Sequence, residues 1–186
     1  TGALTPLQRD DGSVIPGLSI RRNGLTLGTA SITQTGPFEF GSILSIGDVT
    51  AGLTDVSITF DATVDFNGDF FLASSSAELF PGSSKSATIT DGSDDSDTYA
   101  VKATLDFTDG QFNGFQFNAD EVEINLGTSL SLNAKDLVID TTATASEEVV
   151  SFDKLGVTVK AGGLALSGEM LNFAFLGDGS FRQKTG

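Results

Sequence analysis

The chain has 186 residues, 39% of them hydrophobic and 19% charged, and a formal net charge of −15, a balance typical of a folded globular protein. It contains no Cys and no His, which excludes disulfide bonds, thiolate metal sites and every catalytic arrangement built on either residue. A surface this acidic repels phosphate backbones, so we expect no nucleic-acid partner, and without an apolar run of about 18 residues we expect no membrane-spanning segment.

The first segment, residues 1–17, is predicted to be an extended arm or linker. It carries Pro6, Pro16 and a turn at Asp10–Gly12, and such residues favour extended and turn conformations. Two interpretations stay open: a frayed terminus, or an arm that pairs with the sheet of a neighbouring subunit. The remainder, residues 18–186, is predicted to form a single all-β domain.

Residues 18–80 show the alternation of apolar and polar side chains that is typical of β-strands. Asn23–Gly24, set between two alternating segments, predicts a hairpin turn. The longest alternation runs over residues 56–67, with apolar side chains on one face and hydroxyl, carboxyl or amide side chains on the other. Asn67–Gly68 then predicts a turn before the chain returns.

The second half of the chain repeats this pattern of short strands and turns. Residues 81–98 are the most polar stretch and predict an exposed loop after Asp91, which is a candidate internal boundary. Further turns are predicted at Asp109–Gly110, Asn113–Gly114 and Gly162–Gly163, and a loop at residues 141–148.

The strand pattern predicts an all-β protein with no substantial helix. With 22 Gly and 4 Pro, the composition favours tight turns and bulges over long helices. Strands that recur every 8–12 residues or so fit a sandwich, a barrel or an irregular β-solenoid equally well. No fixed repeat length fits the chain, which argues against a strict solenoid.

Two clusters of oxygen-bearing side chains are candidate calcium sites, because Ca²⁺ binds oxygen ligands from carboxylates and amides. One lies within residues 91–97 and the other within residues 65–69, and neither has the spacing of an EF-hand. The alternative for both is a solvated acidic surface. No other cofactor is expected. The candidate ligands are Asp91, Asp94, Asp95, Asp97, Asp65, Asn67 and Asp69.

The residue types predict no enzymatic activity and no catalytic residues. A Ser-Lys arrangement could be drawn only from Ser83, Ser84 and Lys85, which lie in a predicted turn. Carboxylate pairs are available, but sugar sites rely on Trp and Tyr, and the chain has no Trp and one Tyr. The Phe residues recur at alternating positions, which indicates a core and not a ligand cage.

Two Gly-punctuated segments, residues 115–140 and 159–175, carry a resemblance to known proteins. In their composition, residues 38–181 resemble the repetitive β-rich regions of large bacterial secreted or surface proteins of the adhesin-like or fibre-like type. The resemblance implies an extracellular structural or adhesive role and assigns no functional residue.

These observations predict an extracellular or cell-surface structural module, a subunit or repeat of a fibre, stalk or surface layer. Strand edges or the N-terminal arm would mediate its self-association. The alternative function is a calcium-dependent adhesion or binding domain of a secreted protein.

Overall fold

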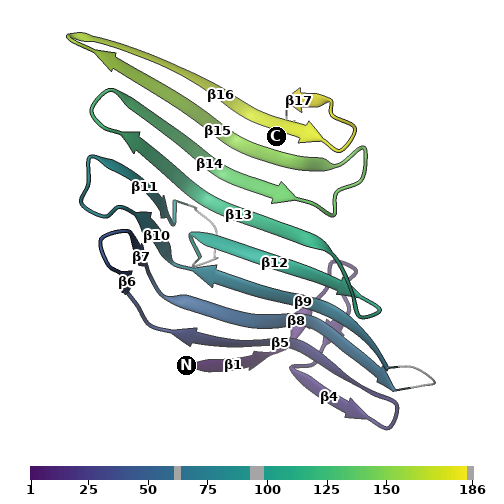
Figure 1. The fold of residues 1–186 in the computed structure, drawn as a ribbon. Coiled ribbons are helices and arrows are strands. Elements are labelled where there is room, and N and C mark those ends of the chain that lie inside the picture. The colour runs from purple at the N-terminus through teal and green to yellow at the C-terminus, as the bar shows by residue number, and fades with distance from the viewer. Residues whose placement is uncertain (61–63, 93–98, 184–186) are drawn as a thin grey trace.

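The computed structural model describes residues 1–60, 64–92 and 99–183, and it is built from β-strands throughout (Figure 1). The predicted all-β class is confirmed, and the described residues form no helix. None of them therefore belongs to a helix long and apolar enough to cross a membrane. Fifteen strands form one curled antiparallel sheet, a half-barrel, and two short strands form a separate hairpin.

The described residues form seventeen strands, most of which belong to the large sheet. They are β1 (Gly2–Thr5), β2 (Leu7–Gln8), β3 (Val14–Ile15), β4 (Leu18–Arg21), β5 (Gly24–Gln34), β6 (Phe38–Phe40), β7 (Leu44–Ile46), β8 (Val49–Phe60), β9 (Val64–Ser74), β10 (Ser76–Leu79), β11 (Lys85–Thr90), β12 (Val101–Thr108), β13 (Gln111–Leu126), β14 (Leu130–Asp140), β15 (Glu148–Ala161), β16 (Leu164–Leu176) and β17 (Phe181–Gln183).

The large sheet is a meander in which several long strands are divided in two. In one half of the sheet the strands lie side by side in the order β5, β8, β9 and β12. In the other half the order is β6, β7, β10 and β11. The long strand β13 pairs with both β12 and β11 on one side and with β14 on the other. From there β14, β15, β16 and β17 follow in order, so the sheet has a β9 half and a β10 half joined by β13–β16 (Figure 1).

The turn predicted at Asn23–Gly24 lies one residue earlier, at Arg22–Asn23, because Gly24 already pairs with Arg21, and the predicted turns at Asp109–Gly110 and Gly162–Gly163 are confirmed. Each joins two adjacent antiparallel strands, β4 to β5, β12 to β13 and β15 to β16. Asp109 and Gly110 both have positive φ, 51° and 72°, which is the backbone of a type I′ hairpin turn. The predicted loop at residues 141–148 also lies between strands, from the end of β14 to the start of β15.

The prediction of one long strand over residues 56–67 is wrong. This stretch contains the end of β8 and the start of β9, which pair with each other at Phe60 and Val64 and at Ile58 and Phe66. Even-numbered residues of β8 pair with even-numbered residues of β9. The apolar alternation of β8 therefore runs on into β9 without a break, and the sequence pattern does not reveal where one strand ends and the next begins.

The predicted turns at Asn67–Gly68 and Asn113–Gly114 are also wrong, because both dipeptides lie inside strands at irregular positions. The β8–β9 register shifts opposite Gly68, where Asp55 has a φ of 50°, and the β12–β13 register shifts beside Gly114. A Cβ on Gly68 would lie 2.8 Å from the Cα of Val56. These glycines therefore accommodate bulges instead of reversing the chain.

One face of the β9 half carries no charged side chain, and we call it the uncharged face. Cross-strand partners share a face, and residues two apart on a strand share it too, so the register assigns each position. Its three rows are Leu4, Ala30, Leu53, Phe70, Leu105 and Phe115; Gly2, Ile32, Ala51, Leu72, Ala103, Phe117, Ile139, Val150, Phe175 and Phe181; and Gln34, Val49, Ser74, Val101, Ala119, Leu137, Phe152, Phe173 and Gln183.

The opposite face of the β9 half is polar. Threonine hydroxyls form hydrogen-bonded cross-strand pairs there, with 2.8 Å between the Oγ1 atoms of Thr33 and Thr50. The same face carries Lys102, Asp69 and Asp106. Such pairs add to the stability of a sheet and keep its face soluble.

The polar face also holds a large aromatic side chain, Phe71, which is only 6% exposed. It lies directly across from Gly52, and a Cβ on that glycine would come within 2.5 Å of the ring. The Nζ of Lys102 lies 5.3 Å from the ring centroid. Phe71 therefore lies flat on the sheet, covering the glycine and accepting a cation–π contact.

Residues 1–17 lie against their own sheet. β1 pairs with β5, and β2 and β3 form the small hairpin. The guanidinium of Arg9 makes a two-pronged ion pair with the carboxylate of Asp55, including a 2.9 Å bond from Nε to Oδ2. Ile15 is buried beside Gly28, whose N–H donates to the carbonyl of Pro16.

Candidate functional site

A row of acidic and amide side chains crosses the sheet between its two halves, and we call it the transverse row. It consists of Asp120, Asp136, Asp153 and Asn172 on β13, β14, β15 and β16. The three ladders between these strands are interrupted at these positions and continue in the same register on either side. Asp136 and Asn172 have positive φ values of 53° and 50°. A left-handed residue interrupts the pleat of a strand, as in a bulge.

The apolar pattern of these strands shifts by one residue at the transverse row. On β13 the apolar residues are odd-numbered before the row, as at Phe117, and even-numbered after it, as at Ile124. β14, β15 and β16 show the same shift, and Asp48 and Ser75, which separate β7 from β8 and β9 from β10, are joined by a hydrogen bond. The transverse row therefore lies where the apolar pattern changes phase on four neighbouring strands.

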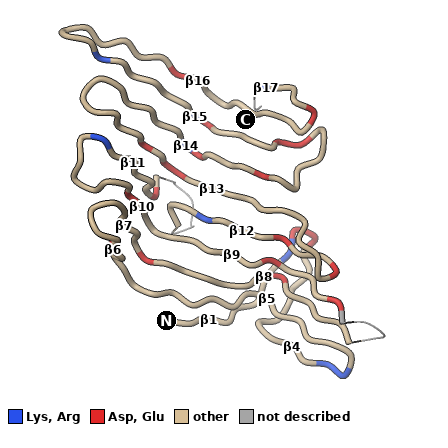
Figure 2. Tube along the Cα trace, viewed as in Figure 1, with Lys and Arg blue, Asp and Glu red and all other residues tan. Residues whose placement is uncertain are grey.

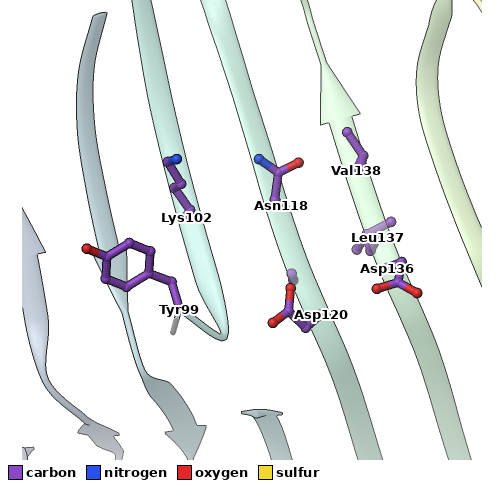
Figure 3. A pocket seen from close by; sticks show the side chains of 8 residues that line it. Tyr99, Lys102, Asn118, Asp120, Asp136, Leu137 and Val138 are labelled. Atoms are coloured by element: carbon purple, nitrogen blue, oxygen red, sulfur yellow. The ribbon is translucent and has the colours of Figure 1, made fainter. Parts of the chain in front are cut away.

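A polar hollow of about 230 Å³ lies beside the transverse row (Figure 3). Tyr99 lines it from the segment before β12, Lys102 from β12, Asn118 and Asp120 from β13, and Asp136 from β14. A second hollow of about 190 Å³ lies on the other side of Tyr99, between Thr50 and Ser75. These groups offer hydrogen-bond donors and acceptors on a scale that suits water or a small polar molecule.

A second polar cluster joins Asp55, Asp69 and Asp106 near the N-terminal hairpin. Asp69 and Asp106 are direct cross-strand partners. Burial raises the pKa of Asp69 above its ordinary value, and the charges of Asp106 and Asp55 raise it further, while Lys102 opposes them. Arg9 holds Asp55, and the side-chain amide of Asn113 donates to Asp106 at 2.9 Å. Like charges one strand apart are destabilising.

We expect Asp69→Asn to stabilise the fold at pH 7. A raised folded-state pKa means that the folded chain binds a proton more readily than the unfolded chain, so stability rises as pH falls through that pKa. The neutral amide removes this electrostatic penalty. The free energy of unfolding should rise by at most about 1 kcal/mol, because solvent screens the group. Thermal melts of both proteins should differ at pH 7 and converge below about pH 4. A less stable variant at pH 7 would contradict this account of Asp69.

The predicted calcium ligands divide between described and undescribed residues. Asp65, Asn67 and Asp69 lie at alternate positions of β9 and so share one face, and the Oδ1 of Asn67 accepts the N–H of Asp109 at 3.0 Å. Asp91 follows β11 on an exposed segment, and Asp94, Asp95 and Asp97 lie outside the described residues. Among the residues that are described, no three acidic side chains converge into a metal-binding group. Calcium binding stays a prediction.

The outer edge of β16 is long and largely unpaired. β17 covers only Phe173–Phe175, so within the described chain Leu164–Asn172 has no strand on its outer side. Leu164 and Leu166 are 60% and 62% exposed. Glu169 is the one charged residue in this stretch, and its carboxylate lies 3.0 Å from the Nζ of Lys154. At the opposite border of the sheet the outermost strands are the short β1, β4 and β6.

Neither the transverse row nor the hollow at Tyr99 was predicted from the sequence. The row depends on register between strands, but the shift from odd to even apolar positions around Asp120 and Asp136 was a readable signal for it. Figure 2 shows the acidic positions spread over many strands with few basic ones among them, so charge alone does not pick out a site.

Comparison with known proteins adds nothing further: no family model, curated protein or solved structure matches the chain significantly.

Proposed function

We propose that this chain is a structural module of an extracellular fibre, stalk or surface layer, and that it associates with further copies through the β16 edge. The observation that carries the proposal is the outer side of Leu164–Asn172, along which the described part of the chain places no strand. A row of free N–H and C=O groups is a template for another strand. Proteins that must stay monomeric usually protect such an edge with Lys, Pro or a bulge along it.

The composition of this edge supports pairing over protection. Leu164–Asn172 contains no Pro, Lys or Arg, and its apolar side chains are exposed on both sides of the strand. The net charge of −15 would keep unassembled copies soluble until they associate.

The double variant Ala165→Glu/Ser167→Glu should prevent edge association. Both positions share a face of β16 with Glu169, so the edge would present three carboxylates. Each like-charge pair across an added strand costs about 0.2–1 kcal/mol, so several pairs together should raise the concentration needed for assembly at least tenfold. Sedimentation velocity and electron microscopy of the two proteins measure this.

The matched control is Thr128→Glu/Ser129→Glu, which adds the same charge in the exposed turn between β13 and β14. It should assemble as the parent chain does. Equal weakening by both variants would attribute the effect to net charge, and undiminished assembly of the edge variant would remove the β16 edge from the proposal.

A further inference from the structure

The uncharged face presents an apolar surface of the size that stable interfaces use. Ile32 is 69% exposed, Leu72 49% and Phe181 68%, and Leu4, Phe70, Phe115 and Phe175 are exposed on the same face. Large apolar and aromatic side chains offer about 150–250 Å² each, so on the order of 700 Å² is uncovered here. The largest apolar patch of a typical monomer is about 300–600 Å², and a standard interface buries about 800 Å² on each partner.

The same face is hollowed at its β1 border. A hollow of about 570 Å³ is lined mainly by apolar groups of β1, β5, β8 and β9, among them Leu4, Ile32, Leu53 and Phe70. Few large side chains of this sheet are fully buried: among the described residues, the buried apolar set includes only Val56, Phe71 and Phe152 above the size of alanine, with Ile15 from the arm. The sheet by itself supplies only one layer of a core, whereas stable domains have at least two.

We infer that a second copy of this chain covers the uncharged face, so that two sheets stack face to face as a sandwich. Two chains of net charge −15 can approach closely only where neither presents a charge, and the three rows of this face meet that condition from β1 to β17. The charged side chains of the same strands, such as Asp69, Asp106 and Asp140, lie on the opposite face. A second copy also supplies a sheet of equal extent, which stacks at about 10 Å.

This interface is distinct from the β16 edge, because it uses side chains on a face and not the backbone of an edge strand. A chain with both surfaces has two different self-complementary contacts, and a staggered alternation of the two gives an open-ended assembly. The inference stands even if the edge does not pair.

The test is a matched pair of neighbouring substitutions on β12. Ala103→Glu places a carboxylate in the middle row of the uncharged face, between Leu72 and Phe117, and Thr104→Glu places the same charge on the polar face. In sedimentation equilibrium of the full chain, Ala103→Glu should weaken dimerisation at least tenfold relative to Thr104→Glu. Added NaCl should strengthen the parent dimer, because it screens the repulsion between two acidic chains.

A second measurement covers the case in which Ala103→Glu fails to fold. The chain has no Cys, so Leu72→Cys and Thr104→Cys each create a single thiol. Maleimide should label Leu72→Cys at least tenfold more slowly in concentrated than in dilute solution, whereas the labelling of Thr104→Cys should not depend on concentration. Equal labelling at all concentrations, or a dimer that Ala103→Glu leaves intact while the β16 edge variant dissolves it, would overturn the inference and leave the edge proposal standing.

Discussion

Gly52→Val should lower the free energy of unfolding by about 3 kcal/mol, the upper end of what overpacking costs. A Cβ at this position would lie 2.5 Å from the Cζ of Phe71 and 2.6 Å from the carbonyl oxygen of Ala30. The ring could yield only by leaving Lys102 and its buried place, and the backbone oxygen could not yield without breaking the β5–β8 ladder. For a domain of this size the melting temperature should fall by roughly 6–12 °C.

Gly168→Val is the control for this prediction. It makes the same substitution in the middle of a strand, but a Cβ on Gly168 meets nothing within 4 Å. Val is favoured in strands, so the melting temperature of this variant should stay close to that of the parent chain. If both variants lose stability equally, the loss does not come from the contact between Gly52 and Phe71.

Phe173→Ala should destabilise the last strands by about 3 kcal/mol, near the lower end for a large-to-small core substitution because Phe173 is only half-buried. Its ring stacks on Phe152 at 5.7 Å and on Phe181 at 5.5 Å, and it meets the edge of Phe175 at 5.0 Å. Without this ring, the three-residue strand β17 loses the aromatic stack that joins Phe181 to the sheet and keeps its short ladder with β16, the contact of Phe181 with Phe175 and an exposed ion pair. Hydrogen exchange should show early loss of protection at Phe181–Gln183.

Phe175→Ala is the matched substitution two residues along the same strand. Phe175 is more exposed, and within the described chain its ring contacts are limited to Phe173 and Phe181, so its loss should cost clearly less. If Phe175→Ala proved as damaging as Phe173→Ala, Phe173 would not be the centre of the cluster.

Local patterns allowed the strand content and several hairpins to be predicted from the sequence. Asp109–Gly110 marked a real turn because its two central residues both have the positive φ that a tight hairpin of this type requires, and Asn23–Gly24 marked the hairpin of β4 and β5 to within one residue. The same chemistry misled at Asn67–Gly68, where glycine accommodates a bulge in β9. Turns and bulges both favour residues that tolerate unusual backbone conformations, such as Asn, Asp and Gly, so the dipeptide alone does not distinguish them.

The arrangement of strands could not be predicted, because it depends on contacts between distant residues. The pairing of Phe60 with Val64 preserves the apolar alternation between β8 and β9, so the alternation does not reveal this hairpin. The hollow beside Tyr99 requires β12, β13 and β14 to be brought side by side. A protein with a closed core and one with an uncovered sheet face also share the same binary pattern, since that pattern says only which face is apolar.

We expect the open sheet, with its largely unpaired β16 edge and its uncharged face, to associate with further copies of itself. Sedimentation velocity of the purified parent chain over a wide concentration range measures this association. The distribution should move from monomer to larger species as concentration rises, with elongated particles at the upper end. A single monomeric species up to the solubility limit would rule out self-association.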